Sequence, residues 1–124
     1  MTDSTTTIAN LKQHMAEFVR ARDWEKYHRP KNLAMSLAIE AAELMEHFQW
    51  LNNEEVEREL VNEEVRWEVA GEMADVMAYL LSLANATGID LSDAFHAKMC
   101  RIETKYPADL VRGHYKRPDE DKAS

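Results

Sequence analysis

The chain has 124 residues, of which 45% are hydrophobic and 31% are charged, and its formal net charge is −8 at pH 7. This length predicts one globular domain, whose limited core makes oligomerisation helpful. The acidic charge argues against a general binder of nucleic acid or of anionic membranes. No apolar run approaches membrane-spanning length, and residues 1–7 lack the basic and apolar parts of a signal peptide.

Cysteine usage indicates the redox environment. Cys100 is the only cysteine, so no disulfide can form within the chain. A reducing compartment is therefore expected, and a cytoplasmic location is the simplest prediction.

Hydrophobic periodicity predicts the first helices. One is expected to begin at an N-cap among residues 4–7 and to end near Arg22. Pro30 suits the first turn of a second helix, because its missing N–H is not needed there. This helix is expected to continue to about Leu51. A short acidic helix from Glu54 follows, and its charge is most simply a solvated face.

The second half of the chain has the same helical character. A long helix is expected over residues 63–87, with Gly88 as its C-cap. Another helix is expected to open at Asp90 or Ser92 and to end at the Tyr106-Pro107 pair.

No segment shows the alternation that is typical of a strand. Short connections between amphipathic helices predict an all-α, antiparallel four-helix bundle. The predicted domain covers residues 1–110. Residues 111–124 hold Gly, Pro and a run of charges, and they are predicted to be a disordered tail.

Two pairs of carboxylates stand out inside apolar helical segments. Glu40 and Glu43 form one pair, and Glu72 and Asp75 form the other. Residues three apart share a helix face, so antiparallel packing would bring all four together. Such charges repel each other and lose hydration unless a cation compensates them. Oxygen ligands suit Mg²⁺, or Mn²⁺ in its place, better than zinc. The quartet is therefore predicted to be a metal site, and one carboxylate can serve as general base for a water.

A bland interpretation of these carboxylates also exists. A single Glu-x-x-Glu is common on solvated helix faces. The repetition of the pair, each time among Ala, Leu, Met and Val, favours the metal site.

Aromatic and basic residues supply candidates for a ligand. Trp24 and Trp50 fall at predicted helix ends, where they either stack a nucleobase or cover the ends of the bundle. Tyr79 lies one turn after Asp75, and it either points towards the site or packs. Candidates for triphosphate contacts, each also readable as a surface charge, are Lys31, Lys98, Arg101 and Lys105.

A di-iron centre is the main alternative for a four-helix bundle, and it needs Glu-x-x-His on two helices. Glu25 and His28 have that spacing, but in a predicted loop. Asp93 and His96 have it on a helix, with Asp in place of Glu. His47 follows a glutamate by four residues instead of three. The sequence therefore gives this alternative little support.

The two acidic pairs resemble the signature of the MazG-like, all-α nucleotide pyrophosphohydrolases. The flanking motifs resemble the dCTP pyrophosphatase branch of that family, over residues 8–110. These motifs are Arg22-Asp-Trp24, His28-x-Pro-x-Asn-Leu33, Phe48-Gln-Trp50 and Tyr106-Pro107.

The resemblance implies Mg²⁺-dependent hydrolysis of a (d)NTP to the monophosphate and pyrophosphate, in a homodimer or homotetramer that clears the nucleotide pool. It implies dCTP or a modified dCTP as the best substrate, with dUTP or a non-standard purine triphosphate as alternatives. A non-catalytic or di-metal bundle is the remaining alternative. The implied metal-binding and catalytic residues are Glu40, Glu43, Glu72 and Asp75. The implied substrate-binding residues are Trp24, His28, Asn32, Trp50 and Tyr79, with Lys98 and Lys105 near the phosphates.

One position departs from the family pattern. Related sequences often have Asn five residues before the Pro of the Tyr-Pro pair, where this chain has Ile102. One polar contact to the substrate is therefore in doubt, although the metal site is unaffected.

Overall fold

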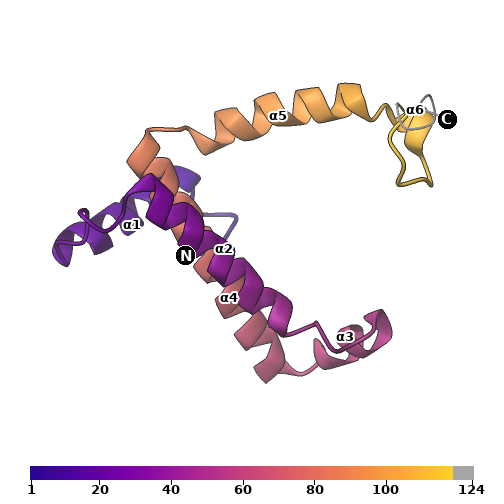
Figure 1. The fold of residues 1–124 in the computed structure, drawn as a ribbon, viewed down its shortest axis with the longest axis horizontal. Helices are drawn as coiled ribbons and strands as arrows, with labels where there is room; N and C mark the ends of the chain where they lie inside the picture. The colour runs from indigo at the N-terminus through magenta and orange to yellow at the C-terminus, as the bar shows by residue number, and fades with distance from the viewer. Residues whose placement is uncertain (119–124) are drawn as a thin grey trace. The chain divides into compact units, whose positions relative to one another are not determined.

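The computed structural model describes residues 1–118, and every regular element in this range is a helix (Figure 1). The prediction of an all-α fold is confirmed. The helices are α1 (Ile8–Ala21), α2 (Pro30–Glu46), α3 (Asn53–Glu59), α4 (Glu63–Thr87), α5 (Leu91–Lys105) and α6 (Ala108–Val111).

The chain forms two compact units, Met1–Gly88 and Ile89–Ser124. The predicted boundary at residue 110 and the four-helix bundle stay predictions. Part of the predicted tail, residues 119–124, lies outside the described residues. Within the described range, no helix is long and apolar enough to cross a membrane.

Side-chain caps explain where the helices begin. At α1, the Thr7 hydroxyl accepts a hydrogen bond from the N–H of Asn10, while the Asn10 side chain accepts one from Thr7, both at 3.1 Å. At α3, the Asn52 side chain and the Glu55 side chain each accept a hydrogen bond from the other residue's backbone N–H in the same way. Asp90, and not Ser92, caps α5. Each cap satisfies N–H groups that have no partner inside the helix.

The end of α2 differs from the prediction. The apolar stripe predicted a helix to about Leu51, but α2 ends at Glu46. The N–H groups of His47 and Phe48 bond to carbonyls three residues back, at 3.3 Å and 2.9 Å, so the chain tightens into turns there. Trp50 consequently lies in a turn beyond the helix. The long α4 runs as predicted, and it ends where Gly88 adopts a φ of 70°.

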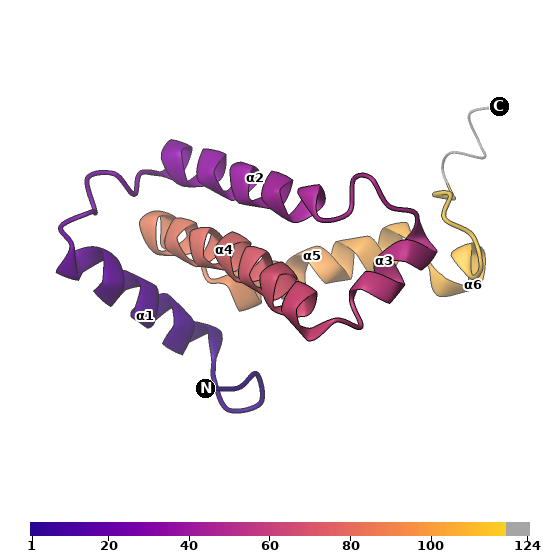
Figure 2. The same ribbon diagram turned by 90° about the horizontal axis from the view of Figure 1, so that it is seen from below.

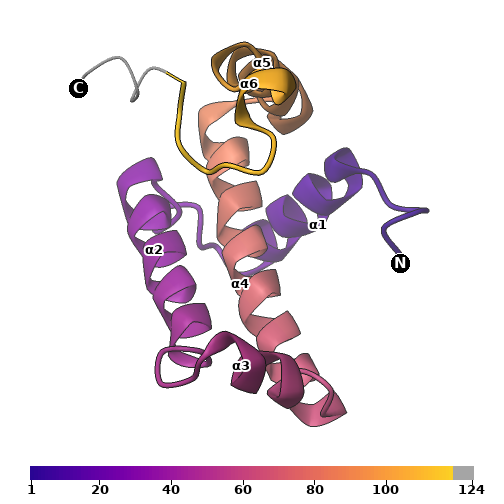
Figure 3. The ribbon, with the colours of Figure 1, turned by 90° about the vertical axis from the view of Figure 1, so that its right-hand side faces the viewer.

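The first unit is organised around α4. Helix α2 lies antiparallel beside it, α3 connects the two at one end, and α1 packs on α4 as well (Figures 2 and 3). The Asn85 amide donates a hydrogen bond to the Lys12 carbonyl at 2.8 Å, which ties α4 to α1. The buried apolar side chains are Val19, Leu33, Val69, Leu81 and Ala84. Packing of α2 on α4 therefore decides which side chains share the space between them.

The second unit contains α5 and α6. The N–H of Tyr106 makes the last bond of α5, to the Ile102 carbonyl at 2.8 Å, and Pro107 has no N–H to continue the series, as the Tyr-Pro pair predicts. Pro107 then stands at the N-cap of the four-residue α6, which the sequence did not predict.

Candidate functional site

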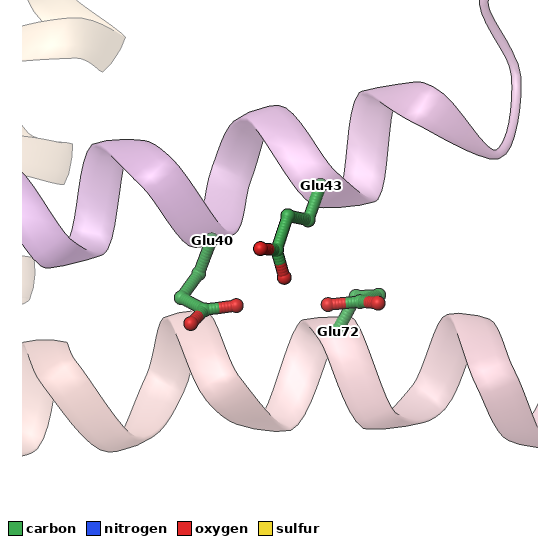
Figure 4. Close-up of side chains that lie close together, drawn as sticks. All are labelled: Glu40, Glu43 and Glu72. Atoms are coloured by element: carbon green, nitrogen blue, oxygen red, sulfur yellow. The ribbon is translucent and has the colours of Figure 1, made fainter.

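Three carboxylates come together between α2 and α4. Glu40 and Glu43 extend from α2, and Glu72 extends from α4, into the space between the two helices (Figure 4). One oxygen of each lies within 4.8 Å of the others. Asp75 is exposed and falls outside this group of three. The structure therefore brings together three of the four carboxylates that were predicted to share a site.

The neighbouring carboxylates change the acidity of Glu40. The pKa of Glu40 is raised to about 7, first by a hydrogen bond with the Glu43 side chain and then by burial. The charges of Glu43, Asp75 and Glu72 raise it further. Asp75 thus acts on the cluster electrostatically although it lies outside the group of three. At neutral pH, the cluster retains part of a proton when no cation is bound.

Two oxygens of the cluster without hydrogen-bond partners indicate whether a cation would fit there. Glu40 and Glu72 are half-buried, and the Oε2 atom of each has no hydrogen-bond partner among residues 1–118. A buried oxygen without a partner is costly. A hard divalent cation would satisfy both atoms, because Mg²⁺ and Mn²⁺ prefer carboxylate oxygens. The donor set therefore fits such an ion.

A histidine that sequence reasoning left outside the site also reaches the cluster. The Nε2 atom of His47 lies 3.6 Å from Oε1 of Glu72. The exposed fractions of the two side chains are 23% and 24%. Neither residue periodicity nor a motif predicted this contact across the two helices.

A cavity of about 210 Å³ lies between α1, the loop after it, and α4. The predicted His28 lines it, and so does Ser82, which was not predicted. His28 Nδ1 and Ser82 Oγ are both buried, without a hydrogen-bond partner in the described part of the chain. Ser82 follows Asp75 by seven residues, which places it on the same face of α4, about 10.5 Å along the axis. That spacing, inside an apolar run, was the signal that could have identified it.

The predicted aromatic and amide contacts have local roles in the described structure. Trp24 packs its ring edge-on against Phe18, with centroids 5.9 Å apart, and remains 42% exposed. Trp50 is 85% exposed, and Tyr79 is half-buried. The Asn32 side chain donates to the Tyr27 carbonyl at 3.1 Å and so fastens the loop before α2. Their roles towards a substrate stay predictions.

The predicted phosphate contacts, Lys98 and Lys105, both lie exposed on α5 in the second unit. The Lys105 Nζ atom lies 5.8 Å from the centre of the Tyr106 ring. Their role towards phosphate likewise stays a prediction.

A helical fold with carboxylates gathered between two helices defines a candidate metal-binding protein. The model of the MazG-like family matches residues 35–116, which include both acidic pairs. The chain belongs to the MazG-like family.

Several proteins resemble the chain over most of its length. Human dCTP pyrophosphatase 1 (Homo sapiens) is 37% identical over 106 residues, which are 86% of this chain and 62% of that protein. The Bos taurus dCTP pyrophosphatase 1 is 36% identical over 110 residues, 89% of this chain and 65% of that protein. The chain thus spans less than two-thirds of the length of these relatives. A solved pyrophosphatase from Archaeoglobus fulgidus is 41% identical, with a TM-score of 0.75 over 86% of this chain and 98% of that one.

Proposed function

We propose that this chain hydrolyses a nucleoside triphosphate to the monophosphate and pyrophosphate, with Mg²⁺ as cofactor and dCTP or a modified dCTP as preferred substrate. One observation carries the proposal: three glutamates share the space between α2 and α4, and two of their buried oxygens have no partner among the described residues. The names of the relatives, dCTP pyrophosphatase 1 and a pyrophosphatase, support the same reaction.

In this proposal the carboxylates have two roles, metal binding and acceptance of a proton. Glu40, Glu43, Glu72 and Asp75 would hold the cation, whose charge would offset that of the triphosphate and of the pyrophosphate leaving group. One carboxylate accepts a proton from the water that attacks the α-phosphorus. A bond forms between the water oxygen and that phosphorus, and the bond to the bridging oxygen breaks. The packing of α2 on α4 would hold these groups near one another before the substrate binds.

The cavity beside α1 is the proposed place for the base. Its volume, about 210 Å³, is below the roughly 300–1,000 Å³ of sites that enclose whole drug-sized ligands. It therefore suits a single heterocycle. His28 Nδ1 and Ser82 Oγ offer unpaired polar atoms to the edge of a base. Trp24 and Trp50 do not line this cavity, and any stacking faces they supply would discriminate poorly between bases, so these polar atoms carry the proposed selectivity.

A homodimer or homotetramer completes the proposal. Large apolar side chains remain exposed at helical spacing on both helices that carry the glutamates. On α2 these are Met35 and Ile39, each 57% exposed; on α4 they are Met73, Met77 and Leu80, at 58%, 40% and 40%. Such stripes mark interaction surfaces. A second copy of the chain would cover them.

The reaction is tested with a panel of common dNTPs and Mg²⁺, with the products separated by ion-exchange chromatography. Monophosphate plus pyrophosphate, lost when chelator is added, with dCTP as the fastest substrate, is the expected result. Release of single phosphates, or no turnover of any nucleotide, would contradict the proposal. A preference for dUTP or a purine triphosphate would keep the reaction and correct the substrate.

The carboxylates are tested by substitution. Glu43→Gln should abolish turnover while the helical circular dichroism signal persists, since removing one charge relieves repulsion in the metal-free cluster. Turnover that survives this substitution would refute the assigned role. Light scattering on a sizing column measures the number of copies.

A further inference from the structure

His47 stands where α2 ends, and its side chain reaches across to α4. Its Nε2 lies 3.6 Å from Glu72 Oε1, and about three-quarters of each side chain is shielded from water. This distance is too long for a good hydrogen bond but within the range of a charge or charge–dipole contact. His47 therefore contacts one oxygen, Oε1, of the Glu72 carboxylate in the cluster.

The two oxygens of Glu72 have different surroundings. Oε1 faces His47, whereas Oε2 is buried without a partner in the described structure. A contact at one oxygen restricts rotation of the carboxylate about its last bond, and so fixes the direction of the other oxygen. In metal sites, groups that bond to the far side of a ligand orient it in this way.

We propose that His47 is a positioning residue of the metal centre: its Nε2–H holds Glu72 Oε1, so that Oε2 is directed at the cation. The proposal rests on the metal-binding role given to the glutamates above. It requires the proton on Nε2, because a bare nitrogen lone pair there would repel the carboxylate.

Two other roles for His47 predict different results. As an internal counter-charge, its imidazole would compete with the cation, and its removal would tighten metal binding. As a purely structural residue at the C-terminal end of α2, where the last turn contains no basic residue, it would interact with the helix dipole. Its removal would then lower stability and leave metal affinity unchanged.

The test compares His47→Leu with His47→Gln, because a glutamine can present an N–H close to the position of Nε2. His14→Leu is the matched control, since His14 is exposed on α1. Mg²⁺ affinity is measured without nucleotide by titration calorimetry, and Mn²⁺ affinity by electron paramagnetic resonance. Urea unfolding with chelator present measures the stability of each metal-free variant.

The expected result is a loss of about 10- to 100-fold in Mg²⁺ and Mn²⁺ affinity for His47→Leu, the usual effect of removing such a partner. His47→Gln should recover most of the affinity, and His14→Leu should match the wild type. Unchanged or tighter binding by His47→Leu would overturn the proposal. A loss of about 10- to 100-fold in His47→Gln as well would also overturn it. If the leucine variant does not fold, the affinity of His47→Gln alone decides between the two results.

The same experiment separates this proposal from the one on which it rests. A wild-type protein that binds neither Mg²⁺ nor Mn²⁺ would remove the metal centre, and the role of His47 with it. A wild-type protein that binds both, and a His47→Leu variant that binds equally well, would leave the metal centre standing and refute His47 alone.

Discussion

Binding of Mg²⁺ to the glutamate cluster should displace a proton from Glu40. The pKa of this residue is raised to about 7 in the metal-free protein. Glu40 is then about nine-tenths protonated at pH 6 and about one-tenth protonated at pH 8. Because the cation binds the carboxylate, we expect release of about 0.9 proton per site at pH 6 and about 0.1 at pH 8. Below pH 7, the apparent affinity should fall about tenfold for each pH unit.

Calorimetry measures this release. Mg²⁺ is titrated at each pH in two buffers of different ionisation enthalpy, and the dependence of the heat on the buffer gives the number of protons. The Glu40 carboxyl ¹³C shift in the metal-free protein reports the same pKa directly. In Glu43→Gln, which lacks the largest cause of the shift, the midpoint should fall towards 4.5. Equal proton release at the two pH values, or a wild-type midpoint already near 4.5, would refute the reasoning.

Substitutions at three further positions test the packing of the core, the lining of the cavity and the stacking of the base. Leu33→Ala should lower the free energy of unfolding by roughly 2–5 kcal/mol in a urea titration, because Leu33 is only 2% exposed, whereas Leu33→Met should cost less than about 1.5 kcal/mol. Ser82→Ala removes a buried hydroxyl that has no partner in the described residues, so stability should hold or rise while the KM for dCTP increases; an unchanged KM would exclude Ser82 from the substrate site. Trp50→Ala should change stability by no more than about 0.5 kcal/mol, because Trp50 is 85% exposed, yet weaken nucleotide binding by about 1–3 kcal/mol, roughly 5- to 150-fold. Unchanged binding would mean that Trp50 does not stack the base.

Helix limits were predictable wherever they depend on local chemistry. Thr7 and Asn52 cap their helices through side-chain bonds within three residues, and Gly88 adopts the left-handed conformation that ends α4. The predicted end of α2, near Leu51, was wrong for a different reason. Phe48 and Leu51 continue the apolar stripe, but an apolar stripe records only which face is buried. It does not say whether the backbone there is helical or follows successive turns.

The site shows the same division between local and long-range information. Spacing of three residues places Glu40 with Glu43 on one face, and this much follows from helix geometry alone. The offset between α2 and α4 depends on how the buried side chains of the two helices pack together. That offset puts Glu72, and not Asp75, within the group of three. It also brings His47 against Glu72, a contact that no pattern within either helix contains.

The raised pKa of Glu40 also makes the metal-free fold sensitive to pH. In the unfolded chain Glu40 loses its proton near pH 4.5, whereas in the folded chain it keeps the proton until about pH 7. The folded state therefore binds more protons between these values, and the Glu40 contribution to stability falls as pH rises through that window. Bound Mg²⁺ should reverse the trend, because it replaces the proton.

Glu40 and Glu72 should consequently respond differently to the same substitution, although they belong to one cluster. Glu40 is compensated by a proton that is lost above pH 7, whereas Oε1 of Glu72 faces the Nε2 atom of His47, 3.6 Å away. In urea titrations at pH 8 with chelator, Glu40→Gln should stabilise the metal-free protein, because the amide removes a repelling charge. Glu72→Gln should stabilise it less, since the relief is offset by the lost contact with His47. At pH 5 the advantage of Glu40→Gln should vanish, because Glu40 is then already neutral. Equal effects of the two substitutions at pH 8 would contradict this reasoning. They would mean that the proton is not held mainly by Glu40 and that the contact with His47 does not distinguish Glu72.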